Sequence, residues 1–301
     1  SPVTNLTITG SAHAGVQYLI GNTGNDSITG TADMDYLTPG AGGTDTLHAG
    51  DGDDVLAMAN VYTTVKSNTG GTITTTVQAP TNATGAGSLF DGGNGFDFLS
   101  IGGDVNFQGT LQSIEGIHLQ PAFANVPIDP PTPATGTNVT QASSQYAAHL
   151  TIANATFAAL PANAEFDGVG TISVNLANTG DSLDGSAFVF TAGSSVQFDL
   201  QGGDGNDVIV GTSGDDIIDA GLGDNTLTGG GGADRFAGPD GADTITDFTL
   251  GVDKLDFTEN DFSKYGQLLD LFETYGSITQ VGPDAVFTAD IAGSVHQITL
   301  Q

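Results

Sequence analysis

A nine-residue spacing of apolar positions dominates the hydrophobic pattern of this chain. Residues 202–246 read GGDGNDVIV, GTSGDDIID, AGLGDNTLT, GGGGADRFA and GPDGADTIT, and FTLGVDKLD follows after Asp247. Every unit has Gly at the fourth place, Asp or Asn at the sixth, and an aliphatic residue or Phe at the eighth. Because only the eighth place is reliably apolar, each unit predicts one short strand with one inward-facing side chain.

A second, less regular array comes earlier in the chain. It reads GNTGNDSIT and GTADMDYLT from Gly21, passes one inserted Pro39, resumes as GAGGTDTLH and AGDGDDVLA, and ends with GGNGFDFLS at residues 92–100. Residues 12–20 resemble a degenerate first unit in which Gln17 replaces Asp. The eighth-place residues of both arrays are predicted to form the core, namely Ile28, Leu37, Leu47, Leu56, Leu99, Ile209, Ile218, Leu227, Phe236, Ile245 and Leu255.

The repeat predicts an all-β solenoid. Glycine reaches positive φ angles without a Cβ clash, so the glycines that begin each unit favour a tight turn before the extended residues. Two units would make one coil, and stacked coils would form two parallel sheets over a thin aliphatic core. We therefore predict a right-handed parallel β-roll or β-helix with two arrays.

Four segments are expected along the chain. Residues 1–120 would hold the first array with an inserted hairpin at about 60–88, and residues 121–200 a linker and an irregular β-helix-like segment. Residues 201–256 would hold the second array, and residues 257–301 a small C-terminal cap.

The segments outside the arrays carry weaker patterns. Residues 60–78 alternate β-branched residues around a Ser-Asn-Thr-Gly-Gly turn, which predicts a hairpin that is either a plain surface loop or a contact surface. The Pro-rich residues 121–137 predict a linker or surface loop.

Residues 142–200 predict strands and a short helix near 145–160, and these would continue as coils into the second array; a separate β-sandwich is the alternative. Residues 261–274 predict an amphipathic cap helix, and residues 286–300 predict strand.

Composition adds a requirement for cations. The 301 residues include 35 Asp and Glu against 4 Lys and Arg, a formal charge of -31, so the folded chain would repel itself unless cations neutralise part of it. This charge makes nucleic acid an unsuitable partner. There is no Cys, so metal is the alternative cross-link in an extracellular protein, and no stretch is long and apolar enough to span a bilayer.

The phase of the aspartates points to calcium. Stacked coils would bring each sixth-place carboxylate close to the next, an unfavourable contact without a cation. Calcium accepts six or more oxygen ligands, including the main-chain carbonyls that Gly-rich turns leave available. Turn formation alone would explain one or two Gly-Asp pairs, but it does not explain Asp held at one phase through a long run.

These residues resemble the RTX nonapeptide family, whose pattern GGxGxDxUx is matched in full by residues 92–100 and 202–210. The resemblance implies several calcium ions, each held between a unit and the unit two places on by both sixth-place side chains and early-turn carbonyls. Within this family, the chain most resembles a type I-secreted bacterial surface-layer or adhesin protein.

Carried over to this chain, the resemblance implies pairs Asp207–Asn225, Asn225–Asp243, Asp216–Asp234, Asp26–Asp45, Asp35–Asp54 and Asp45–Asp97. A neutral amide at Asn225 should weaken the two ions that it shares. Carbonyls of Thr212, Gly214, Gly229 and Gly231 would support the Asp216–Asp234 ion. The remaining implied ligands are Gly24, Gly40, Gly42, Gly92, Gly203, Gly205, Gly238, Asp240 and Asp253.

Catalytic motifs are absent from the sequence. The five His residues (His13, His48, His118, His149 and His296) are scattered, and there is no HExxH, GxSxG, Cys nucleophile or P-loop. Glu115, Glu165, Glu259 and Glu273 fall outside the units, and nothing in the sequence brings them together. We therefore predict no enzyme activity.

The leading hypothesis is a calcium-dependent structural module of a secreted surface protein, a surface layer or adhesin. Its expected partners are calcium and copies of itself or a cell-surface component. The alternative is the calcium-binding, secretion-linked region of an exported protease or lipase. A plain calcium buffer fits poorly, because buffering needs no long β-rich spacer.

Overall fold

The computed structural model describes residues 5–11, 15–40, 42–59, 63–69, 72–78, 85–120, 148–237, 241–256, 276–281, 284–291 and 294–301. These residues are almost entirely β-structure, and the single helix among them is α1 (Asn154–Phe157). The chain divides into two compact units, the first made of residues 1–150 and 168–170 and the second of residues 151–167 and 171–301.

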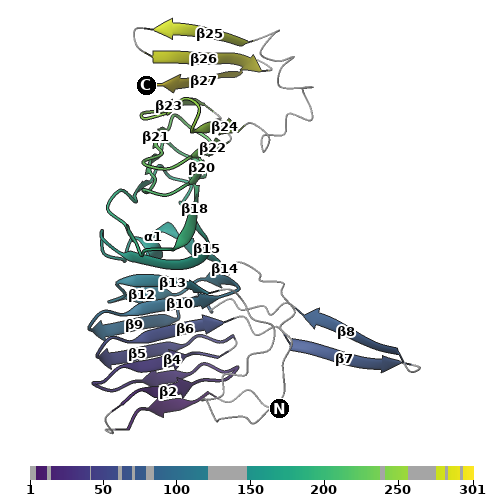
Figure 1. Cartoon of the computed structure of the whole chain (residues 1–301), viewed down its shortest axis with the longest axis vertical. Coiled ribbons are helices and arrows are strands. Elements are labelled where there is room, and N and C mark those ends of the chain that lie inside the picture. The colour runs from purple at the N-terminus through teal and green to yellow at the C-terminus, as the bar shows by residue number, and fades with distance from the viewer. Residues whose placement is uncertain are drawn as a thin grey trace. The chain divides into compact units, whose positions relative to one another are not determined.

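The first unit contains two sheets of stacked parallel strands (Figure 1). One sheet has the order β1-β3-β5-β9-β12, with strands Thr7–Thr9, Ser27–Thr29, Thr46–Asp51, Leu89–Asn94 and Thr110–Gln112. The other contains β2-β4-β6-β10-β13, with strands Gln17–Ile20, Asp35–Thr38, Val55–Ala59, Phe98–Gly102 and Gly116–Gln120. Strands β11 (Asp104–Phe107) and β14 (Ala148–Ala153) complete the region, and the unit boundary falls within β14.

The second unit repeats this plan. One set of strands has the order β16-β19-β21-β23-β27-β26-β25, with bounds Ser182–Asp184, Val208–Val210, Thr226–Thr228, Ala242–Ile245, Ser294–Leu300, Asp284–Ile291 and Gly276–Val281. The other contains β18-β20-β22-β24, with bounds Ser195–Gln201, Ile217–Asp219, Arg235–Ala237 and Lys254–Asp256. Strand β15 (Glu165–Asn175) pairs in parallel with β17 (Val189–Phe190).

The strand register shows that two nine-residue units form one coil. Within each array the strands alternate between the two sheets, and Ile209 lies opposite Leu227 and Ile218 opposite Phe236. Every eighth-place residue listed above is buried except Leu255, which is half-buried. The prediction of an all-β parallel solenoid of the β-roll type is therefore confirmed.

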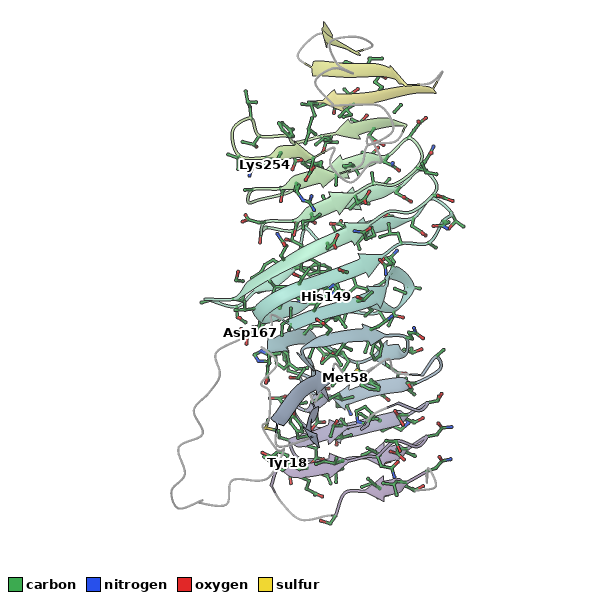
Figure 2. All side chains as sticks on the ribbon, turned by 90° about the vertical axis from the view of Figure 1, so that its right-hand side faces the viewer. Tyr18, Met58, His149, Asp167 and Lys254 are labelled. Atoms are coloured by element: carbon green, nitrogen blue, oxygen red, sulfur yellow. The ribbon has the colours of Figure 1, made fainter. Side chains whose placement is uncertain are left out.

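Because equivalent places lie opposite one another in the strand register, equivalent side chains form columns along each unit. The rings of Tyr18, which is labelled in Figure 2, and Tyr36 have centroids 5.6 Å apart on neighbouring strands β2 and β4. The columns at the eighth place form the apolar core, whereas those at the sixth place consist mainly of aspartate side chains. One local geometry repeated along the chain thus positions every candidate ligand.

The segment before the second array is built differently. Phe157, Phe166, Phe188, Phe190 and Phe198 form an aromatic cluster in the second unit, with ring centroids 5.0 to 6.3 Å apart. Such contacts bury large apolar areas where the nine-residue pattern is lost. Strand β18 pairs in parallel with β20 and β16 with β19, so this segment continues into the second array as predicted, and is not a separate sandwich.

Two further predictions are confirmed. Strands β7 (Thr63–Thr69) and β8 (Thr72–Gln78) form the antiparallel hairpin, and β26 and β27 are the strands expected near the end of the chain. The short helix expected near 145–160 is the four-residue α1.

Other predictions lie outside the described residues: the Pro-rich segment 121–137 and the cap helix at 261–274. Across the part of the chain that the structure describes, no helix has the length and apolarity needed to cross a membrane.

Candidate calcium sites between the coils

The sixth-place side chains lie between coils with almost no exposure to solvent. Asp35, Asp54 and Asp97 are 0% exposed, and seven further side chains at this place are at most 3% exposed, namely Asp26, Asp45, Asp207, Asp216, Asn225, Asp234 and Asp243. Burial of an ionised carboxylate is costly unless it is paired, hydrogen-bonded or bound to a metal. The contacts of each carboxylate oxygen therefore indicate what these positions can bind.

One carboxylate oxygen of each pair accepts a main-chain hydrogen bond from the previous coil. The N–H of Asp54 donates to Asp97 Oδ1 at 2.7 Å, and the N–H of Asp216 donates to Asp234 Oδ1 at 3.0 Å. The same contact joins the N–H of the first residue to Oδ1 of the second in Asp26–Asp45, Asp35–Asp54, Asp207–Asn225, Asn225–Asp243 and Asp234–Asp253, at 2.6 to 3.0 Å. We call these N–H to Oδ1 contacts ladder hydrogen bonds, and they link each coil to the next.

The other oxygen, Oδ2, has two environments that depend on the second place of its own unit. Where this residue is not Gly, its N–H donates to Oδ2, as Thr31 does to Asp35 at 2.6 Å and Thr212 to Asp216 at 2.5 Å. Asn22 makes the same bond to Asp26 at 2.5 Å.

Where the second place is a glycine at positive φ, this bond is missing. Gly50, Gly93 and Gly203 have φ of 120°, 101° and 87°. Their units contain three Oδ2 atoms that are buried without a hydrogen-bond partner, those of Asp54, Asp97 and Asp207. A buried carboxylate oxygen without a partner suits a cation ligand.

The first-place glycines leave room for a main-chain carbonyl beside the carboxylate. A β-carbon built on Gly211 would lie 2.4 Å from the carbonyl oxygen of Gly229 and 2.6 Å from Asp216 Oδ2. On Gly202 it would lie 2.1 Å from the carbonyl oxygen of Ala220 and 2.8 Å from Asp207 Oδ2. Carboxylate and carbonyl oxygens from successive coils thus converge where only Gly fits.

Burial also makes these acids hard to ionise without a cation. Burial, with a neighbouring carboxylate as a smaller cause, raises the pKa of Asp54 and Asp216 from 3.8 to about 7. Burial likewise raises the pKa of Asp45, Asp97 and Asp234 to about 6. A divalent cation would reverse this effect by favouring the charged form.

The donors therefore fit calcium. They are carboxylate and carbonyl oxygens, the ligands of a hard cation, and nitrogen and sulfur are absent from the set. Within the described ranges, no three Asp, Glu or His side chains gather as a metal cluster. Each ion would thus need main-chain oxygens beside its two sixth-place side chains.

Comparison with known families agrees with this geometry. The model of the RTX calcium-binding nonapeptide repeat matches four times, at residues 11–43, 39–57, 199–227 and 210–245. The chain carries RTX calcium-binding repeats. The matched residues cover most of both arrays but exclude residues 92–100, where the RTX pattern is also complete.

Other comparisons give little more. A search of curated proteins found no match. Among solved structures, the extracellular lipase LipA from Serratia marcescens is similar at 19% identity and a TM-score of 0.28. The match covers 96% of this chain, which spans 38% of the lipase chain.

The structure changes one predicted RTX pair. Asp45 does not stack on Asp97: its N–H donates to Ser88 Oγ at 2.9 Å, and Asp97 stacks on Asp54. The sequence could not show this, because residues 60–84 lengthen one coil and shift the pairing to a separation of 43 residues. The pairs Asp26–Asp45 and Asp35–Asp54 are neighbours as predicted, and their role in binding metal stays a prediction.

Pro39 is not the inserted residue. The carbonyl oxygen of Pro39 faces Gly21, so Pro39 holds the first place of its RTX unit, and Gly40 faces Asn22 at the second. The extra residue lies between Gly40 and Gly43, since Gly43 faces the fourth-place Gly24. Gly42 has nothing within 4 Å of a built β-carbon.

The remaining predicted carbonyl ligands sit at the turns. The carbonyl of Thr212 accepts the N–H of Gly231 at 2.9 Å, and that of Gly203 accepts the N–H of Leu222 at 2.8 Å. A β-carbon on the fourth-place glycine of the next coil would contact Gly205 or Gly214. Gly92 faces Asp97 Oδ2, whereas Gly238 and Asp240 are outside the described residues.

Three sixth-place residues escaped the sequence pattern: Ser88, Glu115 and Asp181. Asp181 donates its N–H to Asp207 Oδ1 at 2.6 Å, and Glu115 Oε2 accepts the N–H of Asp97 at 2.8 Å. Glu115 lies outside the matched repeats, but the structure brings it beside Asp97 at the position of a sixth-place residue. The available signal was the aliphatic or aromatic residue two places later: Phe90, Ile117 and Leu183.

Proposed function

We propose that this chain is a calcium-dependent structural module of an exported protein. Its buried sixth-place carboxylates carry the proposal, because Oδ2 atoms and main-chain carbonyl oxygens converge between coils at glycines. Calcium there would neutralise stacked charge and join each coil to the next. Without it, the same carboxylates oppose stacking.

We propose that the ions lie between the stacked pairs. In the first array these are Asp26–Asp45, Asp35–Asp54 and Asp54–Asp97, and in the second Asp207–Asn225, Asn225–Asp243, Asp216–Asp234 and Asp234–Asp253. Asp54, Asn225 and Asp234 would each serve two neighbouring spaces. Occupation of one space would then order the ligands of the next.

Calcium dependence suits export. Extracellular calcium modules bind at about 10⁻⁴–10⁻³ M, which is far above cytosolic calcium. The chain would stay expanded inside the cell and fold outside, where the metal supplies folding free energy. We propose that the folded module then serves at the cell surface, in a surface layer or an adhesin.

Circular dichroism with calcium and with excess chelator tests the calcium dependence. We expect the β-signal to require calcium and to return when calcium is restored. A β-signal that is the same in chelator would refute calcium-dependent folding.

Electron microscopy of the calcium-loaded protein tests the surface role separately. Ordered assemblies that form only with calcium would support a surface layer. A strictly monomeric loaded protein would favour the alternative, a secretion-linked region of an exported enzyme.

A further inference from the structure

The part of the solenoid that stacks on the last coil of the first array lies outside the matched repeats. Residues 110–118 read TLQSIEGIH and lack the turn glycines, yet Ile117 is 0% exposed and lies opposite Leu99 of the preceding coil. Glu115 holds the sixth place of this turn, and its Oε2 accepts the N–H of Asp97 at 2.8 Å. Glu115 therefore meets Asp97 as the sixth-place aspartates meet one another.

Asp97 presents an unused ligand atom. Its side chain is 0% exposed, and its Oδ1 accepts the N–H of Asp54, but its Oδ2 has no hydrogen-bond partner. Burial raises the pKa of Asp97 to about 6, and the charge of Glu115 contributes in the same direction. A buried carboxylate in this state lacks a compensating charge.

The main-chain carbonyl of Ser113, a residue with a strained backbone, lies beside Gly92 together with Asp97 Oδ2. Ser113 has φ of 51°, a conformation that costs energy for a residue with a side chain. A β-carbon built on Gly92 would lie 2.1 Å from the carbonyl oxygen of Ser113 and 2.6 Å from Asp97 Oδ2. These are the same two kinds of oxygen, in the same arrangement, that meet at Gly202 and Gly211 in the second array.

We propose that a calcium ion binds between Asp97 and Glu115, with the carbonyl of Ser113 as a further ligand. This site deepens the proposed function, on which it rests, and lies outside the residues that the repeat model matches. Oxygen-only donors with main-chain carbonyls suit calcium better than zinc or magnesium. The ion would join the coil that carries Asp97 to a turn that has no RTX consensus.

The test counts calcium ions per chain by equilibrium dialysis, for the unaltered chain and for Asp97→Asn, Glu115→Gln and the double variant. Both amides keep an oxygen that can accept a ladder hydrogen bond, as Asn225 does from the N–H of Asp207 at 2.8 Å. Glu115→Gln should lose one ion. Asp97→Asn should lose that ion and weaken or lose the ion that it shares with Asp54, and the double variant should lose no more ions than Asp97→Asn. The exposed Asp51→Asn, an equal change in charge nearby, should lose none.

Two results would overturn the site. An unchanged ion count in Glu115→Gln would remove Glu115 as a ligand, and a double variant that loses more ions than Asp97→Asn would mean that the two residues serve separate ions. Should Glu115→Gln also lose β-signal, Glu115→Asp, which restores the consensus residue, must recover the ion. Failure of the unaltered chain to bind any calcium would instead refute the proposed function.

Discussion

The buried sixth-place aspartates combine three features: burial, a ladder hydrogen bond on Oδ1, and an Oδ2 whose partner depends on the second place. Asp216 is hydrogen-bonded within its own unit, because Thr212 donates both its N–H and its Oγ1 hydroxyl to the carboxylate. Asp54 shows the open form, in which Oδ2 has no partner. The second-place residue therefore decides whether Oδ2 has a hydrogen-bond partner within its own unit.

The raised pKa values predict an unusual pH dependence for the metal-stripped protein. Asp54 and Asp216 have pKa values of about 7 when folded against 3.8 ordinarily, so the folded state binds more protons between these values. The free energy of unfolding should then fall as pH rises from about 4 to about 7. Circular dichroism of the stripped protein should therefore show more β-signal at pH 5 than at pH 7.5.

Calcium should reverse that trend. Calcium competes with protons for the same carboxylates, so its affinity should rise across the same pH range. A stripped protein that is more stable at pH 7.5 than at pH 5 would contradict the assignment of these buried acids.

Asn225→Asp should have opposite effects with and without calcium. Asn225 Nδ2 donates to Asp243 Oδ1 at 2.8 Å, and Asp would lose this bond and add a charge between Asp207 and Asp243. Without calcium we expect the folded state to lose about 1–3 kcal/mol of stability, seen as a weaker β-signal at pH 5 than that of the unaltered chain. With calcium the added carboxylate should tighten binding, as measured by calorimetric titration.

The control for this variant is Asn206→Asp. Asn206 is exposed at the fifth place, where Asp215 and Asp224 occur in the following units. The same charge change there should alter neither quantity measurably. Equal effects of the two substitutions would mean that net charge, and not the sixth place, governs calcium affinity.

At the scale of the element, the turn glycines set how closely successive coils can approach one another. Carbonyl oxygens of one turn face the glycine α-carbons of the next, so coils approach more closely than residues with side chains permit. The same approach places carbonyl oxygens beside carboxylates. Coil spacing and the candidate ligand set therefore have one cause.

Gly230→Ala tests this close approach. Gly230 has φ of 97°, and its built β-carbon would lie 2.0 Å from the carbonyl oxygen of Thr212. Gly193 has a similar φ of 91° with nothing within 4 Å, so Gly193→Ala carries only the conformational strain of about 1–2 kcal/mol. Urea unfolding in calcium should show Gly230→Ala losing at least twice as much stability, and equal losses would refute the role of coil contact.

At the scale of the whole molecule, we expect negative charge to govern when the chain folds. A formal charge of -31 on 301 residues opposes compaction, and much of the acid lies where stacking brings it together. General screening by salt reaches buried pairs poorly, so salt should not replace a bound ion. Compaction should therefore depend on the kind of cation.

Small-angle scattering measures this selectivity. The stripped chain should approach the radius of gyration of an unfolded chain of this length, about 60 Å, and calcium should reduce it. Magnesium at the same concentration should act far less, because it holds its waters and demands octahedral geometry. Equal compaction by magnesium or sodium would indicate charge screening in place of coordination.

The sequence by itself determined the period, the buried eighth places and the alternation of strands between two sheets. These follow from local rules: the Gly-rich turn, the short extended segment and its single apolar residue recur in every unit. The hairpin β7–β8 and the strands at 284–300 were also local patterns. A feature that depends on nine consecutive residues can be predicted from them.

The tertiary structure alone decided which carboxylates meet. Asp54 stacks on Asp97 across 43 residues, and Asp45 stacks on Ser88, because the inserted residues lengthen one coil. Glu115 joins the ladder without turn glycines, since Ile117 packs beneath Leu99. Contacts between coils depend on coil length and packing, which a repeat pattern does not specify.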